Sequence, residues 1–239
     1  MIAWVTGAAG SVGKALTDRL NELGWNVTPT DLTMDVRDAT LMDQFAGYLQ
    51  PDVTFHLAGA KHAPDGELDP AGVVATNVDG TRNVLNAKSG KVVLASTCKA
   101  ADPETAYGAS KLLAERMVLN AGGVVARFFN VRETSGNVFE IWRNADTIEA
   151  TPCWRYFISL EQAVDLLIKC AVRPSGRYAV HPGSPVYMPH LAGSLYPDRE
   201  RVLIAPRRGD RIREPLHAAS ETAVLDEGLL RITSPHDPC

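Results

Sequence analysis

The sequence predicts an α/β protein with a doubly wound parallel sheet and a small C-terminal subdomain. Residues 1–130 alternate short β-prone apolar runs with helical patterns, which is typical of a parallel sheet covered on both faces. The first run leads directly into a glycine-rich turn that opens a helix. Residues 131–239 are looser, with a late core helix and strand among prolines and arginines, and a tail near 234–239 that is expected to be disordered. A chain of 239 residues can form one such domain with an appendage.

Turn residues and changes of period set the expected elements. Gly24 ends the first helix, and Asp31 closes the second strand. Asp35 and Val36 follow too soon for a crossover helix, so the link to the third strand is expected to be irregular. The expected strands are Met1–Thr6, Trp25–Thr30, Val53–Leu57, Lys91–Ser96, Val124–Phe128 and Arg177–Val180. The expected helices are Ser11–Leu23, Ala39–Tyr48, Ala71–Ala87, Tyr107–Asn120 and Leu160–Val172.

Composition excludes several classes of function. The net charge of −4 gives no general case for binding nucleic acid or a membrane surface. No run of about 18 apolar residues predicts a transmembrane helix, and the immediate first strand leaves no room for a signal peptide. The four cysteines lack metal-like spacing, so we expect reduced thiols, a cytoplasmic protein and no metal site. These cysteines are Cys98, Cys153, Cys170 and Cys239.

The glycine turn predicts a Rossmann-type dinucleotide site. Gly7, Gly10 and Gly13 lie between a strand and a helix, where glycines let a pyrophosphate approach the backbone N–H groups of the helix start. Asp31 is placed to accept hydrogen bonds from the adenosine ribose, and no arginine follows it, which favours NAD over NADP. The alternative is that Asp31 only caps a turn.

Tyr107 and Lys111 predict proton transfer to or from a hydroxyl-bearing substrate. Their Tyr-x-x-x-Lys spacing places a phenol and an ammonium one turn apart on the same helix face. The lysine is expected to lower the pKa of the phenol, so that Tyr107 can exchange a proton near neutral pH. Together with a dinucleotide site, this pair indicates hydride chemistry.

Six segments in order resemble the extended short-chain dehydrogenase/reductase superfamily. Within it they are most similar to the nucleotide-sugar (UDP-N-acetylglucosamine-type) 4,6-dehydratases of polysaccharide biosynthesis. The segments are PDVTFHLAGAKHAP, TNVDGTRNVL, ASTCKAADPETAYGASKLLAE, RFFNVRETSGNV, WRYFISLEQAVDLL and PRRGDRIREPL.

The resemblance implies a set of cofactor contacts. The pair Asp35 and Val36 resembles one that meets adenine, and Asn77 matches an asparagine behind the active site, although it could instead make a hydrogen bond within its own helix. The residues implied to contact NAD are Gly7, Gly10, Ser11, Val12, Gly13, Asp31, Asp35, Val36, Ala58, Gly59, Ala60, Asn77, Tyr107 and Lys111.

The resemblance also implies catalytic roles for Thr97, Cys98 and Lys99, which follow a strand as ligand-binding residues of such sheets do. Thr97 would share a hydrogen bond with the Tyr107 phenol or the substrate C4 oxygen, and Lys99 would remove the C5 proton. Cys98 departs from the pattern, because most relatives carry an aspartate there as the acid for the departing C6 hydroxyl. A protonated thiol could serve as that acid. Cys98 could also be a buried apolar filler, or the elimination could be altered.

Basic and polar residues along the same segments map onto positions that hold the sugar or the nucleotide diphosphate in relatives. Arginine forks suit a diphosphate, although a solvated surface is the ordinary place for an arginine. The expected substrate residues are Lys61, His62, Asn130, Arg155 and Arg207, with Arg208 and Arg211 as further candidates.

The function implied is an NAD-dependent nucleotide-sugar dehydratase, with a UDP-sugar as its expected substrate. Alternatives are a nucleotide-sugar 4-epimerase, a dehydratase that forms a 5,6-ene, and a non-catalytic NAD-binding regulator. By resemblance, a homodimer would form through the helices that carry Asn77 and Tyr107.

Overall fold

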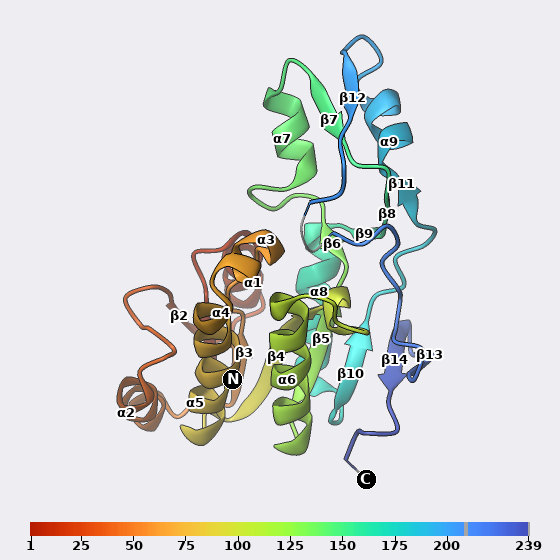
Figure 1. Cartoon of the computed structure of the whole chain (residues 1–239). Helices are drawn as coiled ribbons and strands as arrows, with labels where there is room; N and C mark the ends of the chain where they lie inside the picture. Colours follow the sequence, from red (N-terminus) through yellow and green to blue (C-terminus); the bar gives the residue numbers. More distant parts are fainter. Residues whose placement is uncertain (208–209, 239) are drawn as a thin grey trace.

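A single eight-stranded sheet organises the computed structural model, which describes residues 1–207 and 210–238 (Figure 1). The strand order is β13-β14-β10-β5-β4-β3-β1-β2, parallel from β2 to β10 and antiparallel at β14 and β13. The strands are β1 (Ile2–Thr6), β2 (Asn26–Thr30), β3 (Val53–His56), β4 (Lys91–Thr97), β5 (Val124–Phe128), β10 (Gly176–Ala179), β13 (Thr222–Asp226) and β14 (Leu229–Thr233).

Helices cover both faces of this sheet because successive strand residues point to opposite sides. Ala3 and Val5 pack in one apolar cluster with α1 (Ser11–Glu22) and α8 (Leu160–Val172). Trp4 packs in the opposite cluster. The helices on that side are α2 (Ala39–Leu49), α5 (Gly80–Asn86) and α6 (Ala106–Asn120).

The expected helix over residues 71–87 is present in three parts. It begins at Pro70 as α4 (Pro70–Val74), continues through a π-helical turn at Ala75–Asp79, and ends as α5. Asp69 caps the start by accepting a hydrogen bond from Gly72 N. A short helix, α3 (Ala63–Leu68), precedes it. Such π turns are frequent near functional sites, and this one carries Asn77.

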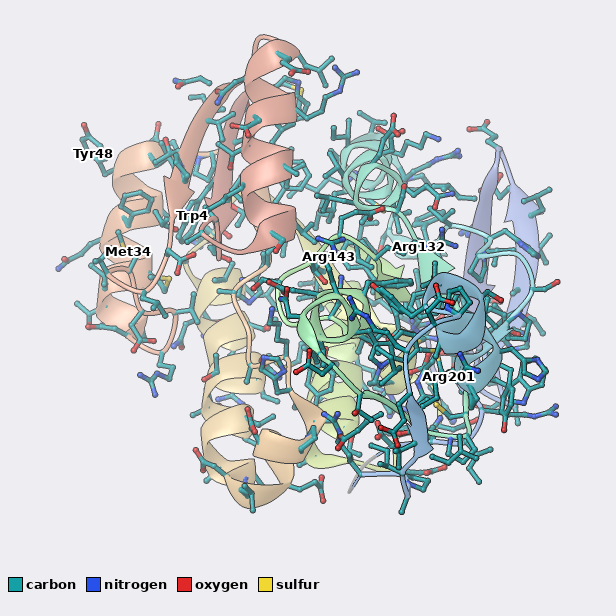
Figure 2. The ribbon with its side chains drawn as sticks, turned by 90° about the horizontal axis from the view of Figure 1, so that it is seen from above. Trp4, Met34, Tyr48, Arg132, Arg143 and Arg201 are labelled. Carbon is teal, nitrogen blue, oxygen red and sulfur yellow. The ribbon has the colours of Figure 1, made fainter. Side chains whose placement is uncertain are left out.

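The residues directly after β2 are irregular, but the link to β3 contains the helix α2, so the expectation of an irregular link without a crossover helix is wrong. Residues 31–38 form turns with no strand, and Asp38 then caps α2 by accepting a hydrogen bond from Leu41 N. The chain therefore passes from β2 through α2 directly to β3, and β2 is the edge of the sheet. Seen from above, Trp4, Met34 and Tyr48 lie on this side of the molecule (Figure 2).

A second lobe lies above the carboxyl ends of the parallel strands (Figure 1). It is formed by two separate segments that pair with each other: β7 with β12, and β8 with β11. Trp142 and Met188 are buried in its own apolar cluster. The lobe contains α7 (Val138–Asn144), β7 (Ile148–Ala150), β8 (Trp154–Arg155), β11 (Val186–Tyr187), α9 (Met188–Leu195) and β12 (Arg201–Leu203). Two short strands, β6 (Asn130–Val131) and β9 (Phe157–Ile158), pair with each other and pack on the core beneath the lobe.

The tail predicted to be disordered makes specific contacts as far as the structure describes it. Residues 234–238 form a turn in which Asp237 accepts a hydrogen bond from Ser234 N. Asp237 also pairs with the buried Arg177 at 3.2 Å. Cys239 lies outside the described residues. Within those residues, no helix is both long and apolar enough to span a bilayer.

Candidate active site

The glycine turn has a backbone that only glycine can adopt. Gly7 has φ +68°, and a Cβ there would lie 2.6 Å from Ala58 N. A Cβ on Gly13 would collide with the Gly7 carbonyl oxygen, and Gly10 N donates to that same oxygen at 3.2 Å. The turn thus brings the start of α1, with Ser11 and Val12, against the loop after β3. This close backbone approach fits a dinucleotide pyrophosphate.

Asp31 fastens the glycine turn to the end of β2. Its carboxylate accepts hydrogen bonds from Ala9 N at 2.6 Å and from Leu32 N at 2.8 Å. The turn-capping alternative is therefore present in the structure, and it holds the carboxylate where a ribose contact is expected. Asp35 is paired with Arg37 at 2.6 Å, and Val36 is buried in the core. The contact of Asp35 and Val36 with adenine stays a prediction.

Asn77 joins the loop Ala58–Ala60 to the helix that carries Tyr107. Its side chain accepts from Ala60 N at 2.8 Å and donates to Ala60 O at 3.1 Å. It also donates to Ser110 Oγ at 2.9 Å, so its bonds run between segments and not only within its helix. A Cβ on Gly59 would lie 2.8 Å from Asn77 Oδ1, which explains the small residue there.

His56 is a further buried link, between the end of β1 and the helical segment that carries Asn77, and the sequence did not reveal it. Thr6 Oγ1 accepts from Leu57 N and Ala58 N, so its proton is directed at His56 Nδ1, 2.8 Å away. The other ring nitrogen, Nε2, then donates to Thr81 Oγ1 at 3.1 Å, and Thr81 donates to Asn77 O. Complete burial, with a smaller effect of Lys111, lowers the pKa of His56 to about 3. His56 is therefore a neutral imidazole with protonated Nε2.

Tyr107 and Lys111 lie on one face of α6, but their electrostatics differ from the prediction. Burial raises the pKa of Tyr107, while Lys99 and a hydrogen bond with Thr97 lower it in part. Lys111 Nζ donates to Ala95 O at 2.6 Å. Burial lowers the pKa of Lys111 to about 8. The expectation that Lys111 lowers the pKa of this phenol is therefore wrong for the protein alone, where Lys99 is the nearby cation.

Cys98 occupies the apolar side of the strand end. Its side chain is 1% exposed and packs in a cluster with Phe129 and Ile158. Burial raises the pKa of its thiol to about 12. A group so enclosed and so weakly acidic is poorly suited to protonate a departing hydroxyl, and the filler alternative describes its surroundings better.

Lys99 is present at the end of β4 as expected, but it is held as an ammonium. Its Nζ lies 2.9 Å from Glu214 Oε1. Burial opposes the charge, but Glu214 outweighs this and raises the pKa of Lys99. Glu214 keeps its own charge, because Lys99, Arg155 and Asn130 lower its pKa against the effect of burial. Lys99 cannot accept a C5 proton in this state, so its predicted role as a simple base does not match its surroundings.

Glu214 is the principal site residue that the sequence did not identify. It lies within the quoted segment PRRGDRIREPL, where the arginines drew attention and the single glutamate did not. The chain has a predicted site lysine, Lys99, and a single glutamate, Glu214, in this arginine-rich segment. That combination is the signal that could have indicated the Lys99–Glu214 pair.

A cavity of about 570 Å³ separates the lobe from the core, and it brings all five expected substrate residues together. Lys61, His62 and Asn130 line it from the core side. The other lining residues are mixed: Trp142, Phe157, Met188 and Ile204 are apolar, and Arg155 and Arg207 are charged. Its size and mixed lining are typical of a small-molecule site.

None of the described residues that line this cavity is an expected catalytic residue, but two of them are hydrogen-bonded to parts of the predicted site. Ser135 lines it, and Ser135 N donates to Ser11 Oγ at 3.0 Å, at the start of α1. Asn130 lines it and donates to Glu214 at 2.7 Å, next to Lys99. Arg211 lies at a smaller neighbouring cavity, where it donates to Ala101 O. Arg208 lies outside the described residues.

A buried charge network supports α6 from behind, and the sequence did not predict it. Glu115 pairs with Arg127 at 2.6 Å and with Arg177 at 2.7 Å. Arg127 in turn pairs with Glu221 at 2.7 Å, just before β13. The network therefore ties the C-terminal hairpin to the helix that carries Tyr107.

Comparison with known proteins now identifies the family. Residues 20–227 match the family described as polysaccharide biosynthesis protein. The chain belongs to that family. The predicted resemblance to its nucleotide-sugar 4,6-dehydratases is thereby confirmed.

Relatives of this chain carry three kinds of name. The UDP-N-acetylglucosamine 4,6-dehydratase (inverting) of Campylobacter jejuni is 27% identical, over 93% of this chain and 79% of its own length. The probable polysaccharide biosynthesis protein EpsC of Bacillus subtilis is 32% identical over 67% of this chain, which is 30% of its own length. A UDP-glucose 4-epimerase of Rickettsia bellii is 33% identical, over 56% of this chain and 44% of its own length.

Solved structures confirm the predicted α/β fold of the family member. Pen from Bacillus thuringiensis superimposes with a TM-score of 0.88 at 22% identity, over 99% of this chain and 90% of that chain. The UDP-glucose 4-epimerase of Thermus thermophilus, solved as a complex with NAD, gives a TM-score of 0.82 at 20% identity, over 90% of each chain.

Proposed function

We propose that this protein is an NAD-dependent nucleotide-sugar dehydratase acting on a UDP-sugar. The observation that carries the proposal is the Lys99–Glu214 pair, which lies at the end of β4 and is linked through Asn130 to the 570 Å³ cavity. An enzyme that only oxidises and reduces C4 needs Tyr107 and a dinucleotide, but it has no use for a second proton-transfer group such as Lys99. The dehydratase relative from Campylobacter jejuni supports the same assignment.

The residues of the glycine turn, Asp31, the loop Ala58–Ala60 and Asn77 would hold NAD. The close backbone approach at Gly7 and the small residue at Gly59 fit that ligand. When bound, NAD supplies the hydride acceptor for C4 and the hydride donor that ends the cycle, so no external oxidant is consumed. Cytoplasmic location and a homodimer remain predictions from the sequence.

Tyr107 would take the proton of the C4 hydroxyl as a phenolate in the proposed reaction, and the Lys99 ammonium and the Thr97 hydroxyl, which lower its pKa against the effect of burial, favour that form. The resulting 4-keto group acidifies the C5 hydrogen. Lys99, which starts as an ammonium, donates a proton to the C6 oxygen as the C6–O bond breaks and the electrons of the C5–H bond form the C5–C6 double bond, so that water departs. The amine so formed takes the C5 proton, and Lys99 returns to its starting charge. Hydride return to C6 would be accompanied by protonation of C5, and the proton that Tyr107 gained in the first step would balance it. Cys98 has no part in this scheme.

Mass spectrometry and proton NMR of products from a panel of UDP-, dTDP- and GDP-sugars test the proposal. We expect a product lighter by one water, without added oxidant. A retained 5,6-ene would give vinyl proton signals at the same mass. Tight NAD binding without turnover of any sugar would instead support a non-catalytic regulator and overturn the proposal.

A 4-epimerase is the second candidate, because a Rickettsia bellii relative carries that name and because Cys98 does not supply the usual acid. Lys99→Met separates the two. It should abolish water loss by a dehydratase, whereas an epimerase should stay largely active and give a product of unchanged mass.

A further inference from the structure

Glu214 is a buried carboxylate shared by three segments that are distant in the sequence. It accepts from Lys99 Nζ at 2.9 Å, after β4, and from Asn130 Nδ2 at 2.7 Å, at the start of β6. Arg155 Nε, at the end of β8, lies 3.5 Å from the same carboxylate. The side chain of Glu214 is 2% exposed, whereas that of Lys99 is 27% exposed and can be reached from outside. The Glu214 carboxylate is thus the buried member of the ion pair, and the Lys99 amine is the partly exposed member.

The charged neighbours of Lys99 identify Glu214 as its principal partner. Among the described residues, Glu214 is the one ion-pair partner that the Lys99 side chain has. The other titratable or charged groups around the amine are Tyr107, Cys98, Glu104, Arg155, Asp210 and Arg211. Glu104 and Asp210 lie toward Arg211 and Arg155, respectively, and Cys98 is buried in the apolar cluster.

We propose that Glu214 is the positioning residue of the active-site amine: it fixes the charge and direction of Lys99 and links it to Arg155 on the cavity wall. A buried carboxylate next to an ammonium favours the charged amine and restricts its rotamers. Asn130 and Arg155, which line the cavity, also contact the Glu214 carboxylate. This one carboxylate therefore orients both Lys99 and two residues of the cavity wall. The consequence for catalysis rests on the proposed function, but the effect on Lys99 does not.

The ionisation of Lys99 tests the inference without substrate. NMR of the protein with ¹³C-labelled lysine side chains, with the Lys99 signal assigned by its loss in Lys99→Arg, should show an amine that stays charged beyond about pH 10. Glu214→Gln keeps the shape but removes the charge, and should lower the pKa of Lys99 by about 1 to 3. Glu104 lines the same smaller cavity as Lys99 and Glu214. Glu104→Gln is the matched control and should leave the pKa of Lys99 unchanged.

An unchanged Lys99 titration in folded Glu214→Gln protein would overturn the inference. Should that variant not fold, Glu214→Asp keeps the charge but withdraws it from the amine, and a smaller fall in the same direction is expected. No fall in that variant would count equally against the inference.

Turnover then separates this inference from the proposed function. In Glu214→Gln the alkaline limb of the rate of water loss should move to lower pH by the same amount as the Lys99 titration, while Glu214→Asp should recover part of the rate at neutral pH. If the wild-type protein turns over no nucleotide sugar, the proposed function fails, and the titration still decides the role of Glu214. If it does turn over but the alkaline limb and the Lys99 titration both stay in place in Glu214→Gln, the positioning role fails alone.

Discussion

At the scale of single residues, Cys98 and Lys99 show how burial redistributes chemistry among neighbours. They are adjacent in the chain, yet the side chain of Cys98 packs among apolar residues and Lys99 reaches Glu214. In the apolar cluster, the thiol loses the solvation that its anion needs. In the proposed reaction, the proton transfers at the end of β4 are therefore assigned to Lys99, with Glu214 as its partner.

Cys98→Ala should lower the rate of water loss by less than about tenfold, because the thiol is not placed to donate a proton. If Cys98 were the acid, the loss would be about 10²-fold or more. Steady-state rates on the accepted nucleotide sugar distinguish the two outcomes. Cys170→Ala, at another fully buried cysteine, controls for the effect of a cavity.

Tyr107→Phe should reduce turnover by about 10²- to 10⁴-fold, because in the proposed reaction the phenol exchanges a proton at C4. Binding of NAD should survive, since the glycine turn is unchanged. The rise in melting temperature produced by NAD, measured for wild type and variant, checks this point. Loss of that rise together with activity would show that Tyr107 supports binding and not proton transfer.

Much of the site could be predicted because local pattern sets it. The glycine turn, the Tyr-x-x-x-Lys spacing and the residues after β4 are fixed by positions close together in the chain. Glu214 could not be placed in the same way, since it meets Lys99 across 115 residues. The charge on Lys99 and the burial of Cys98 depend on such long-range neighbours, and those were the points at which the predicted roles were wrong or incomplete.

At the scale of elements, a buried hydrogen-bond chain couples the end of β1 to α5 through His56. Each member has one direction in which it can donate, and this fixes the tautomer of the imidazole. A second proton on the ring would leave the Thr6–His56 contact without an acceptor. The arrangement is therefore stable only while His56 is neutral.

His56 should make folding sensitive to mild acid. Its pKa is about 3 in the folded protein and about 6.5 once the chain unfolds, so its contribution is complete above about pH 6.5 and is lost as the pH falls toward 3. At pH 5 the loss amounts to about 2 kcal/mol. Denaturant unfolding of the wild type should show a free energy of unfolding that falls between pH 7 and pH 5. In His56→Gln this fall should be smaller by about 2 kcal/mol. The exposed His62→Gln should behave as wild type, and an equal fall in all three proteins would contradict the prediction.

The charge network behind α6 should be costly to break from one side. Glu115→Gln leaves Arg127 and Arg177 buried without the carboxylate they share, and should lower the free energy of unfolding by about 3–5 kcal/mol. Urea unfolding measures this change. Glu22→Gln, which breaks an exposed pair with Arg19, should leave stability close to that of wild type.

The strands and helices themselves were predictable because their periods differ clearly, and α8 and β5 have the predicted bounds. The two-residue strands of the lobe were not predictable. β8 pairs with β11 across a long intervening stretch that includes α8 and β10, and no local pattern records such a partner.

At the scale of the whole molecule, the cavity depends on the meeting of two bodies. Lys61 and Asn130 come from the core, while Trp142, Met188 and Ile204 come from the lobe. Arg143 and Arg201 mark the lobe in the view from above (Figure 2). A ligand in this cavity must contact both.

UDP alone should therefore slow amide hydrogen exchange in both bodies at once. We expect protection in peptides that contain Lys61 and in peptides that contain Ile204, which mass spectrometry resolves. Peptides from β13, which lies at the far edge of the sheet, provide the control. Protection confined to one of the two bodies would show that the nucleotide does not bridge them.

Both inserts that form the lobe leave the sheet at its carboxyl edge, one after β5 and one after β10. The first ends at the start of α8, whereas the second ends at β13, which runs parallel to β10 and begins at the opposite edge of the sheet. Neither insert interrupts β1, β3 or β4, which lead to the glycine turn, to the loop Ala58–Ala60 and to Lys99, respectively. The length and lining of these inserts can accordingly change without displacing the glycine turn or α6 beneath them.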